Sequence, residues 1–379
     1  MLSGARVLVT GARLPAALEI ARALRAAGAE VWAADSLWIT PTGASRCVKG
    51  YLRLPSPALD PAGFRAGLLH ALRRHEISLV VPASEEVFAL ARLRQEFEPR
   101  TQLFAPGFAQ LRALHSKWQV LKLAAGLGVR IPETERALSR EALQDLVRRH
   151  PDWIVKPEFS RGGYHARVGM PPAGELVSAQ RPWLAQEFIA GREISTFAIV
   201  SRGRVTASAT YLPKYRLGRG ASLYFDPHPS PAADAFVARF AATLGMTGQA
   251  GFDFIETPAG ELALLECNPR ATSGVHLLGD GWARSLLGED VRVTGQSRPC
   301  CSRFGVLSLH GLRAWRNRQW RQLRADLARS RDSCARRGDL WPIWALPLSS
   351  AEIALRSLAW PVSAAQAYTY DLEWNGEES

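Results

Sequence analysis

The sequence predicts three parts: a small doubly wound α/β domain, a strand-rich α+β body, and a helical, basic C-terminal extension. Three observations support this order. Apolar strands and amphipathic helices alternate over residues 6–104, which favours a parallel sheet covered by helices. Six strand-like segments lie between residues 153 and 268, and arginine-rich helical sequence follows residue 310. We therefore expect domains at 1–110, 111–290 and 291–379.

The first part begins with an apolar strand over Arg6–Thr10. A helix over Ala16–Ala27 and a strand over Glu30–Ala34 complete a β-α-β unit, which implies a parallel sheet. The same alternation continues with a helix over Phe64–His75, a strand over Ser78–Pro82, a helix over Ser84–Gln95 and a short strand over Gln102–Phe104. The first turn reads G-A-R-L-P-A and lacks the second glycine of G-x-G-x-x-G, which argues against a nicotinamide-dependent oxidoreductase.

The second part is expected to begin with helices over Leu111–Leu127 and Arg140–His150. It then becomes rich in strand-like segments, which read WIVKP, WLAQEFI, ISTFAIV, RVTASAT, AGFDFIE and LALLECN. A helix over Ala233–Leu244 interrupts them and ends at Gly245. Alternating polar and apolar residues in these strands are typical of an antiparallel sheet.

The composition is that of a soluble globular chain: of 379 residues, 47% are hydrophobic and 22% are charged. No run reaches the roughly 20 apolar residues that span a bilayer, and no signal peptide is visible, so we expect a cytoplasmic protein. Five cysteines without a C-x-x-C pair argue against a disulfide scaffold and against a zinc site.

The third part carries most of the positive charge. The net charge is +12 at pH 7, and Arg313–Arg337 holds nine arginines against two aspartates. This segment is interpreted as part of one long helix over Leu312–Arg337. Two readings stay open: the helix packs on the body with apolar residues inward, or it offers a surface to an anionic partner. The residues expected inward are Leu312, Trp315, Leu323 and Leu327.

A metal site with oxygen ligands is predicted near the end of the second part. In Leu264–Arg270 (LLECNPR), Glu266 and Asn268 are two residues apart and would face the same side of a strand. A hairpin turning at Pro258–Gly260 would place Asp253, from the preceding strand, beside Glu266. Two carboxylates and an amide oxygen suit Mg²⁺ held jointly with phosphates. The alternative is a hairpin with exposed polar positions.

Lysine is rare in this chain, since only five of the 47 basic residues are lysines. Lys156 ends the apolar strand WIVKP, and the loop that follows contains Ser160, Gly162 and Gly163, whose backbone amides could fold over phosphates. Lys117 stands at the start of a helix, where an ammonium can reach a phosphate. Taken alone, a loop of this kind is often a hairpin turn, and a lysine such as Lys117 is more often a solvated surface residue.

Groups that suit adenosine lie in the segment LAQEFIAGRE. Gln186 and Glu193 flank an apolar stretch, so Gln186 could read the exocyclic amine of an adenine and Glu193 could hold ribose hydroxyls. An extended linker would add backbone groups at Glu187 and Ile189. Taken alone, the segment also reads as an edge strand with scattered polar residues.

The order of these elements resembles the ATP-grasp superfamily, and within it the stand-alone carboxylate–amine ligases related to the carbamoyl phosphate synthetase large chain. The resemblance covers about residues 1–290. It implies a Rossmann-like pre-ATP-grasp domain followed by two lobes that clamp ATP. The E-x-N-P-R element with its upstream aspartate is the most specific part of the match, whereas the tail after residue 290 matches no motif of the family.

The resemblance implies roles for named residues. The implied ATP-binding residues are Lys117, Lys156, Ser160, Gly162, Gly163, Gln186, Glu187, Ile189, Glu193 and Lys214. The implied metal ligands are Asp253, Glu266 and Asn268. Arg270 and Lys156 are implied as catalytic, because they would neutralise the transferred phosphoryl group. The candidates for gripping a substrate acid are Arg216, Arg270, Ser273 and Gly274.

The implied activity uses ATP with Mg²⁺ or Mn²⁺ to phosphorylate a substrate carboxylate and to couple the acyl phosphate to an amine. The expected partners are a small-molecule acid and amine, a second copy in a homodimer, and, for the basic extension, a membrane surface or a carrier protein rather than nucleic acid. The alternative is a nucleotide-sensing or anionic-partner-binding protein with this fold and no ligase activity. The sequence names neither the acid nor the amine.

Overall fold

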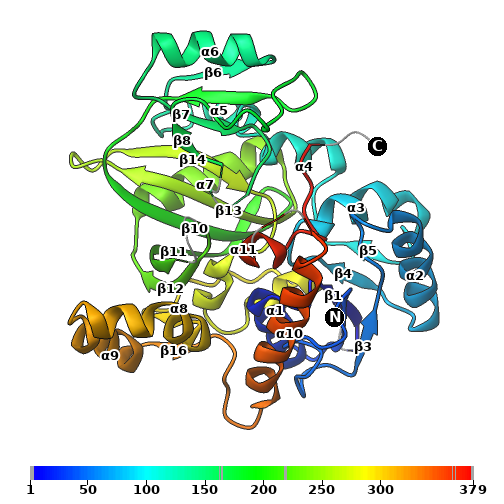
Figure 1. The fold of residues 1–379 in the computed structure, drawn as a ribbon. Coiled ribbons are helices and arrows are strands. Elements are labelled where there is room, and N and C mark those ends of the chain that lie inside the picture. Colours follow the sequence, from blue (N-terminus) through cyan, green and yellow to red (C-terminus); the bar gives the residue numbers. More distant parts are fainter. Residues whose placement is uncertain are drawn as a thin grey trace.

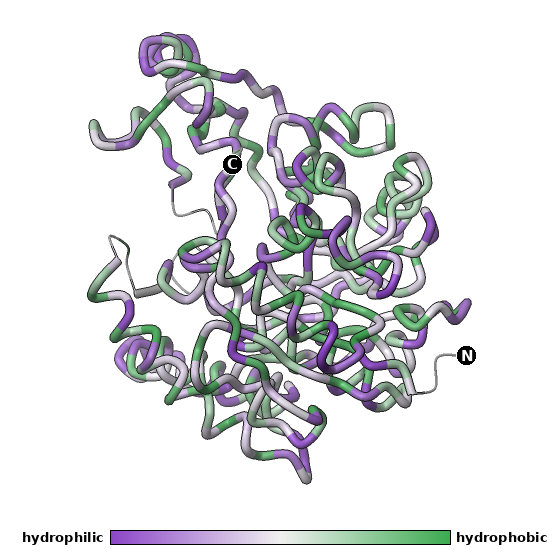
Figure 2. The backbone as a smooth tube through the Cα atoms, turned by 90° about the vertical axis from the view of Figure 1, so that its right-hand side faces the viewer, coloured by the Kyte–Doolittle hydropathy of each residue, from purple (hydrophilic) through white to green (hydrophobic). Residues whose placement is uncertain are grey.

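The computed structural model describes residues 4–161, 163, 165–216, 220–360, 362 and 364–376. Within these residues the strands form a five-stranded, a seven-stranded and a four-stranded sheet, with helices packed around them (Figure 1). Hydrophilic and hydrophobic residues alternate along much of the chain in Figure 2, as expected for elements with one buried and one solvent-facing side. The mixed α/β and α+β architecture confirms the predicted fold class.

The five-stranded sheet is parallel throughout, in the order β3-β2-β1-β4-β5. Its strands are β1 (Arg6–Thr10), β2 (Glu30–Asp35), β3 (Gly50–Arg53), β4 (Leu79–Val81) and β5 (Gln102–Leu103). The helices between them are α1 (Pro15–Ala26), α2 (Pro61–Arg74) and α3 (Glu86–Leu93). The predicted β-α-β alternation is confirmed. The sequence pattern does not reveal β3, because its four residues are mostly half-buried and contain no apolar run.

The seven-stranded sheet runs in the order β14-β13-β10-β11-β12-β15-β16. Its long strands are antiparallel as predicted: β10 (Arg192–Ser201), β11 (Arg204–Arg216), β12 (Ser222–Pro227), β13 (Gly248–Glu256) and β14 (Leu262–Asn268). The helix α7 (Pro231–Leu244) packs on it and ends, as expected, at Gly245, which has the left-handed φ of 53° that glycine tolerates. Two short strands of the C-terminal extension, β15 (Cys300–Cys301) and β16 (Arg331–Asp332), continue this sheet. The domain boundaries stay a prediction.

The four-stranded antiparallel sheet forms the upper layer in Figure 1. Its strands, in order, are β6 (Thr134–Ala137), β9 (Trp183–Gln186), β7 (Ile154–Pro157) and β8 (Arg167–Val168). The helix α6 (Arg140–Arg149) packs on it through Leu143 and Leu146, which are buried with Val155 and Trp183. This sheet presents Lys156 and Gln186 toward the seven-stranded sheet, and both side chains are buried.

The predicted helix over Leu111–Leu127 is wrong in one respect, because it is broken in the middle. The structure has α4 (Phe108–His115) and α5 (Gln119–Ala124) instead. Ser116 has extended backbone angles, and its hydroxyl accepts a hydrogen bond from the backbone N–H of Gln119 at 2.9 Å. A serine that satisfies the first turn of a new helix competes with helix continuation. The break places Lys117 in a corner between the two helices.

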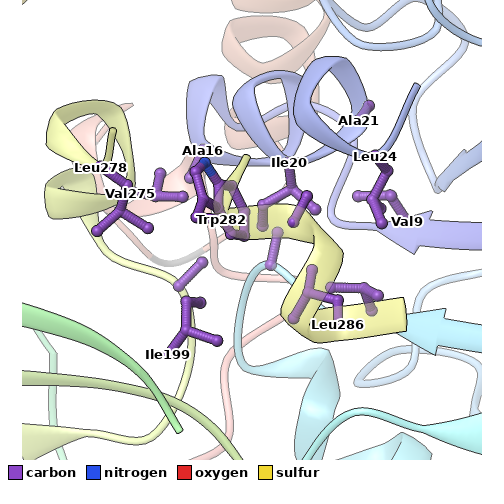
Figure 3. Packing of buried hydrophobic residues seen from close by; sticks show 14 of the residues in the cluster. Val9, Ala16, Ile20, Ala21, Leu24, Ile199, Val275, Leu278, Trp282 and Leu286 are labelled. Atoms are coloured by element: carbon purple, nitrogen blue, oxygen red, sulfur yellow. The ribbon is translucent and has the colours of Figure 1, made fainter. Parts of the chain in front are cut away.

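A shared core joins the parallel sheet to the seven-stranded sheet. The helix α1 packs against the 3-10 helices η2 (Ser273–Leu277) and η3 (Trp282–Leu287), which follow β14. Figure 3 shows Ala16 and Ile20 of α1 beside Trp282 of η3. Burial of these side chains fixes the two sheets relative to each other.

The C-terminal extension differs from the single long helix predicted over Leu312–Arg337. It forms α8 (Arg303–Arg316), α9 (Trp320–Arg329), α10 (Trp341–Ser357) and α11 (Ala364–Ala367). Arg318 has a left-handed φ of 58°, which ends the run of helical backbone after α8. Leu323 is buried and Leu327 packs beside it as expected, but Leu312 and Trp315 are 60% and 69% exposed. The expectation that these two face inward was wrong.

The segment after α11 returns to the middle of the molecule and rises toward α4 in Figure 1. Trp374 stacks on Phe88 of α3 with ring centroids 4.3 Å apart, and it meets Phe159 edge-on at 5.3 Å. Its backbone N–H donates to Glu85 Oε2 at 3.2 Å. The end of the chain therefore bridges the first part and the loop after β7.

Candidate active site

The β13–β14 hairpin brings two acidic side chains together. Asp253 and Glu266 are direct partners in the strand register, with a bulge immediately after Asp253. This is the pairing that the sequence predicts. A bulge re-aims the side chains next to it, which helps to turn both carboxylates to one side.

Hydrogen bonds from polar neighbours hold Asp253 and Asn268, two of the three predicted metal ligands, in place. Ser195 of β10 donates a 2.6 Å hydrogen bond to Asp253 Oδ1, and Asn268 Nδ2 donates one of 3.2 Å to Asp253 Oδ2. The other end of the Asn268 amide, Oδ1, accepts from Arg270 Nη2 at 3.1 Å. The three predicted ligands are therefore contiguous, but Asn268 presents its nitrogen to Asp253, and its oxygen would join a metal only after the amide turns over.

Two lysines from different layers face these carboxylates. Lys117 Nζ donates to the Ser160 carbonyl at 2.6 Å and lies 3.3 Å from Glu266 Oε2. Lys156 Nζ donates to Gln186 Oε1 at 2.8 Å. Both lysines are buried and both carboxylates are partly buried, so charges of both signs lie close together with little water between them.

This concentration of charge shifts the pKa values. Burial would raise the pKa of Glu266, but the ammonium groups of Lys117 and Lys156 outweigh it and lower that pKa. Burial and the neighbouring Glu266 raise the pKa of Asp253. Burial lowers the pKa of Lys156 to about 8, against the opposing attraction of Glu266. Bound phosphate would raise the pKa of Lys156, because an anion stabilises the ammonium form.

Glu158 positions Lys117, and the sequence gives no signal for it. Its side chain is fully buried, accepts from the Ser116 hydroxyl, and accepts from Arg136 Nε at 2.6 Å. Its carbonyl accepts from the backbone N–H of Lys117 at 3.3 Å. The corner between α4 and α5 is therefore pinned to the strand that carries Lys156.

The predicted adenine-binding segment begins at Gln186, the last residue of β9, and continues beyond it. Gln186 donates from Nε2 to Thr134 Oγ1 at 3.0 Å, while its oxygen is engaged by Lys156. The backbone N–H of Glu187 donates to the Glu133 carbonyl at 2.8 Å, and Ile189 is buried. The segment is thus held by its neighbours, and its contact with adenine stays a prediction.

Other predicted residues lie on β10 and β11 in ion pairs. Glu193 pairs with Arg216, which also donates to the Gly220 carbonyl at 3.0 Å. Lys214 Nζ lies 2.6 Å from Asp226 Oδ2 of β12. No contact recorded among the described residues joins Lys214 to the Lys117–Glu266 pair, so its phosphate-binding role stays a prediction.

Arg270 is buried in a network that the sequence does not reveal. Its Nε lies 3.3 Å from Glu85 Oε1, and its Nη1 donates to the Ala271 carbonyl at 3.0 Å. Arg161 Nη1 lies 3.7 Å from the same Glu85 oxygen and donates to Ser84 Oγ at 3.2 Å. Arg161 lies in the loop after β7 that is predicted to fold over phosphates, so Glu85 contacts two guanidinium groups beside the site.

The remaining predictions concern the lid and the segment after Arg270. Ser160 is partly buried and Gly163 has a left-handed φ of 64°, while Gly162 lies outside the described residues. Ser273 is partly buried. Gly274 packs so tightly that a Cβ would lie 2.4 Å from Phe197 Cβ. Gly274 therefore serves close packing, and a role in gripping an acid stays a prediction.

A sequence signal existed for one of the unforeseen residues. Glu85 follows β4, and ligands of parallel sheets gather beyond the carboxyl ends of the strands. Ser195 could be found only through its register partner Asp253 on β13. No local sequence pattern indicates a role for Trp374, because its partners Phe88 and Phe159 lie far away in the sequence.

Comparison with known proteins bears on this geometry. Residues 114–274 match a family model described as the ATP-grasp domain. The match includes both site lysines, the β13–β14 hairpin and Arg270. The chain contains an ATP-grasp domain. The predicted resemblance to the ATP-grasp superfamily is thereby confirmed. No match is found among curated protein sequences.

Solved structures support the same fold. N5-carboxyaminoimidazole synthetase from Staphylococcus aureus in complex with ADP aligns with a TM-score of 0.60 and 12% identity, over 79% of this chain and 82% of that chain. Biotin carboxylase from Campylobacter jejuni in complex with β,γ-ATP aligns with a TM-score of 0.57 and 14% identity, over 74% and 70%. Glycinamide-RNase-transformylase T from Mycobacterium tuberculosis gives 0.56 and 21%, over 78% and 84%. At these identities the likeness concerns the fold.

The residues of the ATP-grasp domain fit a nucleotide and a divalent cation. Asp253 and Glu266 supply adjacent carboxylate oxygens, which suit Mg²⁺ or Mn²⁺ shared with phosphates. Lys117 and Lys156 supply ammonium groups beside them. The ammonium group of Lys117 lies 3.3 Å from Glu266 Oε2, which shows that positive charge is favoured beside this carboxylate.

Proposed function

We propose that the chain is an ATP-dependent ligase that joins a carboxylate to an amine. The observation that carries this proposal is the meeting of Lys117, Lys156 and the carboxylate pair Asp253–Glu266 within an ATP-grasp domain. This arrangement can neutralise a polyphosphate at a site shielded from water. The ATP-grasp fold of solved enzymes that bind ADP or ATP supports it.

The reaction has two balanced steps. A carboxylate oxygen of the substrate bonds to the γ-phosphorus of ATP while the bond from that phosphorus to the bridging oxygen breaks, so ADP leaves. The amine nitrogen then bonds to the acyl carbon, the carbon–oxygen bond to phosphate breaks, and the amine loses a proton. The products are an amide, ADP and phosphate. Positioning and charge neutralisation are sufficient contributions from a protein to phosphoryl transfer of this type.

The side chains divide this work. Mg²⁺ or Mn²⁺, when bound by Asp253, Glu266 and a turned-over Asn268, supplies charge neutralisation at the phosphates. Lys117 and Lys156 bind phosphate oxygens, and Arg270 holds the transferred group or the substrate acid. Ser160–Gly163 would cover the phosphates, with Gln186, Glu187, Ile189 and Glu193 on the adenosine side.

Further parts of the proposal concern partners. Arg216, Ser273 and Gly274 are proposed to line the acid pocket with Arg270. The substrates are a small-molecule acid and amine, the assembly is a homodimer, and the location is cytoplasmic. None of the described helices is long and apolar enough to cross a membrane.

The test is ADP release from Mg-ATP with a panel of amino acids, offered singly and in pairs. A ligase releases ADP only with a particular acid and faster with a particular amine, and mass spectrometry detects the amide. The alternative, a nucleotide-sensing protein, would bind Mg-ATP and release no ADP with any pair. That outcome would reject a ligase of free amino acids and favour the nucleotide-sensing alternative.

A further inference from the structure

The outward face of α10 is apolar along its whole length. Its inward positions are buried against the protein: Pro342, Ala345, Leu346, Ser349 and Ile353. Every exposed position carries an uncharged, apolar side chain: Trp341, Trp344, Pro347, Leu348, Ala351, Ala354 and Leu355. Trp341 and Trp344 are 60% and 68% exposed. Single exposed leucines are ordinary, but a continuous apolar stripe over a 17-residue helix marks an interaction surface.

The loop after β2, in the N-terminal parallel-sheet part, adds exposed apolar residues beside this stripe. Trp38 follows β2 and is 67% exposed, with Ile39 exposed beside it. The backbone N–H of Trp38 donates to Glu352 Oε2 of α10 at 2.9 Å, so the loop is fixed against the helix. The guanidinium of Arg53 lies 3.6 Å from the centre of the Trp38 ring. The surface is therefore assembled from two distant parts of the chain.

Positive charge borders the apolar residues. Arg46 lines a shallow groove with Gly338, Leu340, Trp341 and Trp344, and the exposed Arg337 precedes this groove in sequence. Within the part of the chain that the structure describes, no acidic side chain lines this groove.

The α8–α9 hairpin repeats the same combination. Leu309 and Leu312 line a second groove together with Arg313 and Arg316, and Trp315 and Trp320 are exposed nearby. Between residues 313 and 337, six exposed arginines form no ion pair with another described residue: Arg313, Arg316, Arg318, Arg321, Arg324 and Arg337. By contrast, Arg329 forms an ion pair with Asp226, and both Arg331 and Arg336 form ion pairs with Glu19.

We propose that α10, the Trp38 loop and the α8–α9 hairpin dock the protein on the surface of an anionic phospholipid bilayer. Tryptophan and leucine enter the interfacial region, and unpaired arginines meet lipid phosphates. All three helices lie at the end of the molecule opposite the four-stranded sheet (Figure 1). The active-site cluster, which the four-stranded sheet helps to form, is left free.

The charge of the surface argues for lipid over a second copy of this chain. Two copies meeting through this face would bring two sets of unpaired arginines together, which is repulsive. A phospholipid headgroup layer offers negative charge and an apolar interior at the same interface. Because no described helix can span the bilayer, the association is peripheral.

The test is co-sedimentation of the full chain with vesicles of phosphatidylglycerol and phosphatidylcholine, against vesicles of phosphatidylcholine alone. Binding to the anionic vesicles should weaken as salt rises. Two surface variants are compared with the parent: Trp341→Ser with Trp344→Ser and Leu348→Ser, and Arg313→Gln with Arg316→Gln, Arg321→Gln and Arg324→Gln. Each should bind at least about tenfold more weakly.

Matched variants control for loss of apolar area and of charge elsewhere. Val168→Ser with Leu176→Ser changes exposed apolar residues on another surface, and Arg25→Gln with Arg73→Gln, Arg74→Gln and Arg100→Gln removes four exposed arginines. Both controls should bind as the parent does. Equal binding by the parent and both surface variants would overturn the proposal. So would a dimer in light scattering that the tryptophan variant dissolves while no vesicle binding is seen.

Discussion

Lys117 Nζ lies 3.3 Å from Glu266 Oε2, so the corner between α4 and α5 is tied by charge to β14. The Lys117 side chain is buried and that of Glu266 is 25% exposed, and the pair stands where phosphate and metal are proposed to meet. In an ion pair of this kind each partner stabilises the charged form of the other. The pair thus keeps a cation and a carboxylate ready at the site.

Removing either partner should abolish turnover. Lys117→Ala and Glu266→Ala are each expected to lower ADP release at least about hundredfold, because one charged contact to the phosphates or their cation is lost. Far-UV circular dichroism should stay that of the parent. Lys122→Ala, an exposed lysine of α5, is the control and should turn over normally. Turnover near the parent level in Lys117→Ala would contradict the assignment.

Glu85 should matter more for stability than its sequence neighbour Glu86. Burial would raise the pKa of Glu85, but Arg161, His115 and Arg270 lower it to about 2. Glu85→Gln leaves buried guanidinium groups without a counter-charge, which should cost about 3 kcal/mol. Burial raises the pKa of Glu86, whose side chain accepts from Thr10 at 2.7 Å. Glu86→Gln should therefore cost less than about 1 kcal/mol in urea unfolding.

His115 should make the fold sensitive to acid. Burial lowers its pKa to about 4, against the attraction of Glu85. The unfolded chain, with a pKa near 6.5, therefore binds a proton more readily between pH 6.5 and 4. Stability should fall as the pH falls through this window, by about 3 kcal/mol at most. His115→Phe should reduce this loss in urea titrations, and an unchanged pH profile would contradict the account.

Trp374 should hold down the loop after β7. Trp374→Ala removes a buried ring stacked on Phe88 and should destabilise the protein by about 3 kcal/mol. Loss of its contact with Phe159 should also speed trypsin cleavage after Arg161. Trp344→Ala, an exposed tryptophan, should change neither property. Equal cleavage rates in the two variants would show that the ring does not restrain the loop.

Local patterns predicted the alternation of the parallel sheet, the antiparallel body and the Asp253–Glu266 pairing. Such features follow from periodicity and from hairpins, which connect residues close in sequence. The break at Ser116 was missed because the apolar spacing continues across it. Glu158 and Ser195 were missed because their partners come from distant elements, and no local pattern encodes those contacts. Glu85 follows β4, which is a signal for a site residue, but its partners Arg161 and Arg270 are also distant in sequence.

The outward-facing residues of the extension were missed for a different reason. Leu312 and Trp315 have the spacing of a buried helical face, and a sequence pattern does not say which apolar face meets the protein. Their exposure, and that of α10, appears only once the helices are placed on the body.

Trp374 also has a consequence for the order in which the molecule is made. Its backbone N–H bonds to Glu85, which stands 289 residues earlier in the chain. Domains generally fold as they emerge from the ribosome, with the N-terminal one first. The parallel sheet and residues 114–274 can form on a nascent chain, but Glu85, which contacts Arg161 and Arg270, gains its bond to Trp374 only after residue 374 has been added. A nascent chain that stops before residue 374 therefore lacks this part of the candidate site.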